Sequence, residues 1–281
     1  MTTLVVARWT VAEAVSRRLV LAAVLLSVAF VGVFGLAFSI LYGRAEADTG
    51  EGATFPVFAA TLLTVLGLYA VQFMAAFLAL LLSAGAISGE AESGTLHAVL
   101  ARPLGRAQYL MGRWIASVAL LTAYVVAMAG SLLLIARAVA GYQPVDPVRA
   151  VALLVLETIL LLTVGLLGSS FLPTLANAVV LFSLFGLAWL GGIVEFIGQA
   201  VANQTLVNLG VVVSLVFPSD AVWRAASYYL QPPLFLGEAA TRGGIPLASL
   251  TPPTTALLLW VLAYPVATLL AALRTFARRD L

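Results

Sequence analysis

Two long stretches of the sequence contain no charged residue, and they constrain the fold more than any other feature. Residues 52–89 and 158–194 lack aspartate, glutamate, lysine and arginine throughout. A membrane-spanning helix needs about 20 consecutive apolar residues, so the second stretch is long enough for two spans. The whole chain agrees, since 63% of its residues are hydrophobic and 9% are charged, against about 25% charged residues in an average soluble domain. The sequence therefore predicts an all-α integral membrane protein.

Breaks between the apolar runs predict six spans within one transmembrane domain that covers residues 1–281. We expect these spans at about 19–42, 56–83, 114–136, 150–171, 175–198 and 254–273. Pro173 separates the fourth span from the fifth, because the residue before a proline disfavours helical geometry. In the outer region 199–253, the apolar run Leu206–Phe217 is too short to cross a bilayer, so we expect it to be re-entrant or interfacial. The first run exceeds the core of about 7–15 residues of a signal peptide, and we expect it to be retained as an anchor.

The arginines predict which side of the membrane each loop occupies. All 14 basic residues are arginine, which suggests a GC-rich prokaryotic genome. With the N-terminus inside, the cytoplasmic arginines are Arg8, Arg17, Arg18, Arg102, Arg106, Arg113, Arg274, Arg278 and Arg279, and the outer ones are Arg44, Arg137, Arg149, Arg224 and Arg242. Because basic loops favour the cytoplasm, we expect both termini there and the protein in the inner membrane. Residues 3–18 mix apolar and charged groups at helical spacing and predict an amphipathic helix at the cytoplasmic interface.

The residue types that are missing exclude several classes of function. Without cysteine there is no thiolate nucleophile, disulfide or thiolate metal site. Without lysine there is no Walker A phosphate loop and no Schiff-base chemistry. His97 is the only histidine, so a multi-histidine metal site is impossible. We therefore expect no catalytic residue, no metal site and no bound cofactor in this chain.

The most informative stretch is the polar loop 84–113 between the second and third predicted spans. It predicts a short helix that Ser93 can cap and that Pro103 ends. An apolar face follows from the i, i+3, i+4 spacing of Leu96, Val99 and Leu100. Such a helix, parallel to the membrane on its cytoplasmic side, suits the docking of a soluble partner. The alternative is a loop helix that packs only against its own bundle.

The motifs of this loop resemble those of a known family. Their order is Glu90-x3-Gly94-Thr95-Leu96, then Arg102-Pro103-Leu104-Gly105-Arg106, then Gly112-Arg113. This order is similar to the cytoplasmic loop of ABC transporter permeases of the second exporter type, in which E-x3-G-T-L, a P-x-x-R turn and G-K precede the third span. Arg113 stands where lysine is usual, in keeping with the lysine-free composition. The segment 217–224 before the last span also resembles this family, within which the chain is most similar to the multicopper-enzyme-maturation permeases.

The resemblance implies a permease subunit of an exporter that is driven by a separate ATP-binding subunit. Two copies of that subunit would bind ATP and magnesium, and a groove in each would receive a cytoplasmic coupling helix. The coupling residues carried over from the family are Glu90, Gly94, Thr95, Leu96, Arg102, Pro103 and Arg106. A second copy of the permease, in a homodimer, would complete the translocation path. Membrane lipid is the remaining expected partner, and no nucleic acid is expected.

Two polar side chains fall inside predicted spans. A carboxylate at the centre of a spanning helix costs about 2.5–3.5 kcal/mol, so Glu157 should face the bundle or water. One interpretation is that Glu157 lines a translocation path or relays protons. The alternative is that it is a paired group that packs helices together. Gln72 is interpreted as a helix–helix contact, with a place along a path as the alternative. The rival function is a secondary transporter or channel that uses Glu157 for ion coupling; an intramembrane enzyme is disfavoured because the only histidine lies in the loop.

Three further features belong to the fifth predicted span and the region after it. Glu195 is expected at the outer boundary of the membrane. The small residues Gly186, Gly191 and Gly192 suit close helix packing at a dimer interface. An outer aromatic belt is expected to contain Trp223, Tyr228 and Tyr229, with contact to a substrate as the alternative.

Overall fold

The computed structural model describes residues 6–8, 10, 18–47, 55–89, 105–241 and 248–278, and these residues contain helices and no strand. Six of the helices are long and apolar enough to cross a membrane. They are α2 (Arg18–Ala47), α3 (Phe55–Ser83), α6 (Arg106–Ala140), α7 (Pro147–Ser169), α8 (Thr174–Ala200) and α12 (Thr255–Arg278). The predicted all-helical class and the six candidate spans are therefore confirmed.

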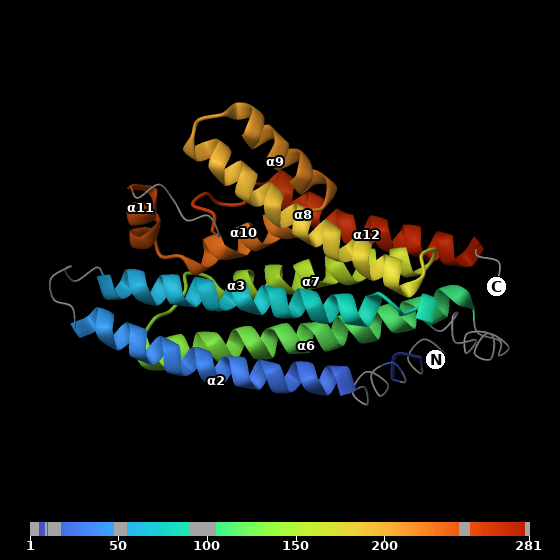
Figure 1. Ribbon diagram of the computed structural model, residues 1–281, viewed down its shortest axis with the longest axis horizontal. Helices are drawn as coiled ribbons and strands as arrows, with labels where there is room; N and C mark the ends of the chain where they lie inside the picture. The colour runs from blue at the N-terminus through green and yellow to red at the C-terminus, as the bar shows by residue number, and fades with distance from the viewer. Residues whose placement is uncertain are drawn as a thin grey trace.

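The helix α7 occupies the centre of the bundle, and α2 lies at its edge (Figure 1). α7 contacts α3, α6, α8, α10 and α12, which suits a sequence that is apolar around its whole circumference. Asp146 begins this helix by accepting a hydrogen bond from the backbone N–H of Arg149 at 3.0 Å, and Pro147 occupies the first turn, where its missing N–H costs nothing. α2 packs mainly on α3 and α6 and exposes most of its leucine and valine side chains.

After α8 the chain turns back on itself rather than crossing directly. The apolar run at 206–217 forms most of α9 (Gln204–Val216), which packs along α8. A break at Phe217 and Pro218 then bends α9 by 102° from α10 (Ser219–Leu230), so the two helices form either a broken span or a re-entrant loop. The short helix α11 (Pro233–Thr241) follows and contacts α3.

Glycines allow α8 and α9 to approach each other closely. A Cβ atom on Gly191 would lie 2.6 Å from Cγ1 of Val213, and one on Gly198 would lie 2.7 Å from the backbone nitrogen of Val207. A Cβ atom on Gly192 would overlap the Asp220 carboxylate of α10. Gly191 and Gly192 thus pack the chain against itself, and the expectation that they serve a dimer interface is wrong for these two positions.

The end of the bundle at which α3 ends and α6 begins is called the loop end here. α6 begins at Arg106, before the start of the predicted span at residue 114. Residues 106–113 are helical and form one continuous helix with that span. The last turn of α12 lies at the same end, since the rings of Tyr109 in α6 and Phe276 in α12 are 6.2 Å apart. Of the predicted amphipathic helix 3–18, residues 6–8 and 10 are helical, and residues 3–5, 9 and 11–17 lie outside the described residues.

Candidate functional site

Most of the predicted coupling residues lie outside the part of the chain that the structure describes. Glu90, Gly94, Thr95, Leu96, Arg102 and Pro103 belong to the segment 90–104, which is not described. Arg106 is described, in the first turn of α6. The structure does describe how the chain is attached on either side of this segment, up to Gly89 and from Gly105 onward.

On the first side, the turn 84–89 after α3 is bound to the turn between α7 and α8. The backbone N–H of Ile87 donates to the hydroxyl of Ser169 at 2.8 Å. The hydroxyl oxygens of Ser88 and Thr174 are 2.9 Å apart and share a hydrogen bond. Gly85 allows this approach, because a Cβ atom there would lie 3.0 Å from the Thr174 methyl group. A displacement of Gly89 would therefore reach the α7–α8 turn directly.

Asn177, in the first turn of α8, joins α8 to the turn 84–89 and to α7. Its amide nitrogen donates to the carbonyl oxygen of Ala84 at 2.9 Å and to that of Gly165 at 2.8 Å. The side chain is 2% exposed, and a Cβ atom on Gly168 would overlap its Oδ1 atom. Asn177 was not among the predicted residues. A single amide inside a long apolar run is nevertheless a usable signal, since polar side chains in membrane helices commonly bond across helices.

On the second side, the first three turns of α6 are bound to α12 and α7. The Arg106 guanidinium donates to the carbonyl oxygen of Ala277 at 3.2 Å. Arg113 is buried, and its Nη1 atom donates to the Tyr109 hydroxyl at 2.7 Å. The indole N–H of Trp114 donates to the Thr163 hydroxyl of α7 at 3.0 Å. Movement of Gly105 would therefore reach α6, α12 and α7.

Gln72 of α3 and Glu157 of α7 meet in the middle of the bundle. The Gln72 amide donates to Oε1 of Glu157 at 2.7 Å, and Glu157 is 1% exposed. The second carboxyl oxygen of Glu157 and the amide oxygen of Gln72 have no hydrogen-bond partner among the described residues. The pair is thus a buried contact between two helices that retains unused hydrogen-bonding capacity.

A second polar cluster joins α8 to α10 and was not predicted. The Arg224 guanidinium forms ion pairs with Glu195 of α8 and, at 3.1 Å, with Asp220 one turn earlier in α10. Glu195 was expected only at the membrane boundary and Arg224 only in an outer loop. Trp223 is completely buried, with its ring 5.1 Å from that of Tyr69. Its expected place in a lipid-facing aromatic belt is therefore wrong.

Comparison with known proteins decides the family. The sequence profile described as ABC-2 family transporter protein matches residues 4–281, which is nearly the whole chain. The chain belongs to this family. It is a permease, the membrane component of an ABC transporter. No curated protein sequence matches the permease.

The family match confirms the broader resemblance seen in the loop motifs. A closer likeness to the multicopper-enzyme-maturation permeases stays a prediction. Among the described residues of the permease, no group of three or more histidine, aspartate or glutamate side chains is arranged to hold a metal ion. The features that remain for function are the two attachments at the loop end and the buried polar groups of the core.

Proposed function

We propose that this permease is the membrane half of an ATP-driven exporter in a prokaryotic inner membrane, with both termini in the cytoplasm. Its energy comes from a separate ATP-binding subunit, which binds ATP and magnesium and docks on residues 90–104. The observation that supports this most is the attachment of both flanks of that segment to the spanning helices. Six contacts with other parts of the bundle support it, made by Ile87, Ser88, Asn177, Arg106, Tyr109 and Trp114.

The attachments give a physical route from the partner to the spans. When the ATP-binding subunits close, they displace the segment 90–104 and with it both flanks. When the turn 84–89 moves, the loop ends of α3, α7 and α8 move with it, because hydrogen bonds join this turn to α7 and α8. The start of α6 carries the end of α12. Small shifts of packed helices of this kind are a common way to convert a local displacement into a change of state.

Two copies of the permease are proposed to enclose the translocation path. In one chain the space between α3, α6 and α7 is filled by side chains that are completely buried, among them Leu68, Leu121 and Leu154. Exposed apolar side chains instead cover much of α8 and part of α3, including Val179, Phe182 and Phe77. A homodimer would place a path between chains rather than through the packed interior of one.

Docking is tested by putting a charge into the apolar face of the predicted coupling helix. The permease is co-expressed with the ATP-binding protein encoded beside it, and co-purification is measured for Leu96→Asp and Ala98→Asp. Ala98 lies opposite Leu96 on a helical wheel, so it is the matched control for an added carboxylate. We expect Leu96→Asp to lose the partner and Ala98→Asp to retain it, with both permeases inserted normally. Normal association of Leu96→Asp would remove the coupling assignment.

One observation favours the rival function, a secondary transporter or channel. Glu157 is buried midway along the candidate span α7, with one carboxyl oxygen unpartnered among the described residues, and intramembrane carboxyl groups often mark ion pathways. Flux that is driven by an ion gradient, without any ATP-binding subunit, and that is lost in Glu157→Gln would establish it. ATP-dependent flux that survives Glu157→Gln would exclude it.

A further inference from the structure

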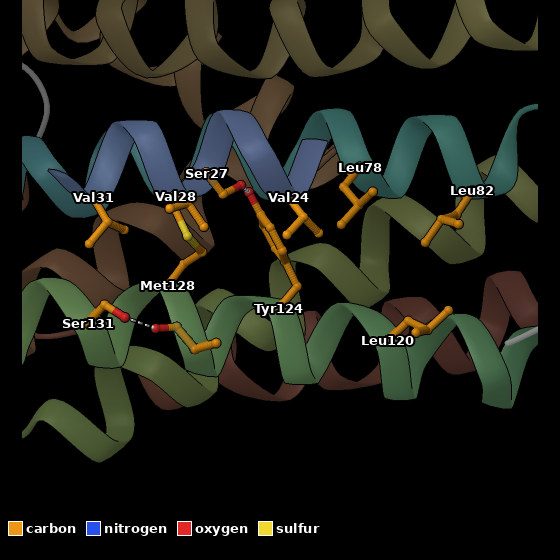
Figure 2. A pocket seen from close by; sticks show the side chains of 11 residues that line it. Val24, Ser27, Val28, Val31, Leu78, Leu82, Leu120, Tyr124, Met128 and Ser131 are labelled. Carbon is orange, nitrogen blue, oxygen red and sulfur yellow. Dashed lines mark hydrogen bonds between the residues drawn. The ribbon is translucent and has the colours of Figure 1, made fainter. Parts of the chain in front are cut away.

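A groove lies between the edge helix α2 and the helices α3 and α6, within their candidate spans (Figure 2). Its volume is about 460 Å³. Its lining, called the α2 groove here, consists of Val24, Ser27, Val28, Val31, Leu78, Leu82, Leu120, Tyr124, Ala127, Met128 and Ser131. α2 lies on the side of the bundle away from α8, α9 and α10 (Figure 1), so the groove that it borders is separate from the polar cluster of Arg224, Glu195 and Asp220.

The lining of the α2 groove leaves no polar group in need of a ligand. The Tyr124 hydroxyl crosses the groove and shares a 2.7 Å hydrogen bond with Ser27, whose own hydroxyl donates to the carbonyl oxygen of Ala23 at 2.7 Å. The Ser131 hydroxyl donates to the carbonyl oxygen of Ala127 at 2.7 Å. The other lining side chains are hydrocarbon or thioether, and none is charged. Water, ions and polar solutes would lose hydrogen bonds on entry and gain none, so the occupant is apolar.

The α2 groove is continuous with the surface that faces the bilayer. Val24 and Val28 line it and are nevertheless 48% and 66% exposed. The same face of α2 continues into exposed residues such as Leu21 and Leu25. Since α2 is a candidate span, the medium in contact with this face is the hydrocarbon of the membrane. An apolar molecule reaches the groove sideways from the bilayer without crossing water.

The size of the groove selects among apolar occupants. A methylene group is about as large as a water molecule, which occupies about 30 Å³ in the liquid, so a groove of 460 Å³ has room for a chain of roughly 15 such groups. That is the length of one membrane-lipid acyl chain. We infer that the α2 groove is a binding site for a single acyl chain of a membrane phospholipid. The chain fills the gap that the Ser27–Tyr124 hydrogen bond spans and holds α2 against α6, independently of how the permease is powered.

The test uses the permease in phospholipid vesicles that contain a phosphatidylethanolamine with a photoreactive diazirine in the middle of one acyl chain. After irradiation, the labelled positions are mapped by peptide mass spectrometry. We expect labelling of Leu120, Tyr124 and Met128 in the groove to exceed clearly that of Val126 and Leu134, which are exposed on α6 outside it. Equal labelling of the groove residues and the exposed residues would overturn the inference, because that pattern is expected from lipid that surrounds the protein without binding in the groove.

A matched pair of variants on α6 tests the site itself. Ala127→Phe puts a ring into the groove, whereas Ala119→Phe puts the same ring on an exposed position that does not line it. We expect Ala127→Phe to reduce labelling of Tyr124 and Met128 to the level of Val126, and Ala119→Phe to leave it unchanged. Unchanged labelling in Ala127→Phe overturns the inference, as does cross-linking of groove residues to a second copy of the chain. The wild-type labelling pattern decides the matter on its own if Ala127→Phe fails to fold.

Discussion

Replacing Asn177 with leucine should loosen the loop end of the bundle by an amount that the structure defines. The leucine side chain has the same number of heavy atoms and the same branching at Cγ as asparagine but donates no hydrogen bond, so the bonds to the carbonyl oxygens of Ala84 and Gly165 are both lost. Hydrogen bonds between membrane helices contribute about 0.6 kcal/mol on average and about 1.7 kcal/mol at most. The expected loss in free energy of unfolding is therefore about 1.2 kcal/mol, with an upper limit of about 3.4 kcal/mol.

The measurement is equilibrium unfolding in mixed micelles, with Asn208→Leu as the control for the same change at an exposed position of α9. Because Asn177 also joins the turn 84–89 to α7 and α8, the variant should retain the ATP-binding subunit but couple its activity less well. A loss in free energy of unfolding no larger than that of Asn208→Leu, together with normal coupling to the ATP-binding subunit, would refute the role assigned to Asn177.

Three further predictions follow from the same contacts. Glu157→Leu leaves the Gln72 amide buried without its partner and should lower the free energy of unfolding by about 1–3 kcal/mol. Glu157→Gln keeps a hydrogen-bond acceptor and should lower it less. Equal losses in the two variants would show that the Gln72–Glu157 hydrogen bond contributes nothing to stability. Ser88→Cys combined with Thr174→Cys should form a disulfide on mild oxidation in this otherwise cysteine-free chain, since the two hydroxyl oxygens are 2.9 Å apart. Coupling to the ATP-binding subunit should survive, because the two positions are proposed to move together. A disulfide that blocks this coupling would contradict the proposal. Burial raises the pKa of Tyr142, in the loop between α6 and α7, to about 12 from 10.0. Its neutral form therefore stabilises the fold below about pH 10, and that contribution is lost as the pH rises through about 12. The tyrosinate absorbance titration of Tyr142→Phe should show a smaller late component than that of the wild type, and an unchanged late component would contradict the burial of this hydroxyl.

The class of the protein and the number of its spans were predictable because membrane insertion depends on local composition. Residues 158–194 are uncharged, and a proline at 173 divides them, so two spans followed without any knowledge of packing. The start of the third span was harder to predict from the sequence. Residues 106–113 carry two arginines and a glycine and are typical of a polar loop, yet they belong to α6, where Arg106 and Tyr109 contact the end of α12.

The contacts between helices were not predictable, because they depend on residues far apart in the sequence. Asn177 bonds a carbonyl oxygen 93 positions earlier, and Arg224 pairs with a carboxylate 29 positions earlier. Nothing in the local pattern distinguishes a glycine that faces lipid from Gly191, which faces α9. The aromatic-belt rule failed for Trp223 because the bend after α9 turns α10 inward, so that this side chain lies in the core.

The most direct test of the proposed function is the ATPase activity of the adjacent ATP-binding protein in lipid nanodiscs, measured alone, with this permease and with its Leu96→Asp variant. We expect a stable complex whose ATPase rate differs from that of the free subunit and returns to the free value with Leu96→Asp. If no ATP-binding protein associates, and the permease alone supports an ion-dependent flux that is lost in Glu157→Gln, the ATP-driven mechanism is contradicted and the intramembrane carboxyl group becomes the functional centre.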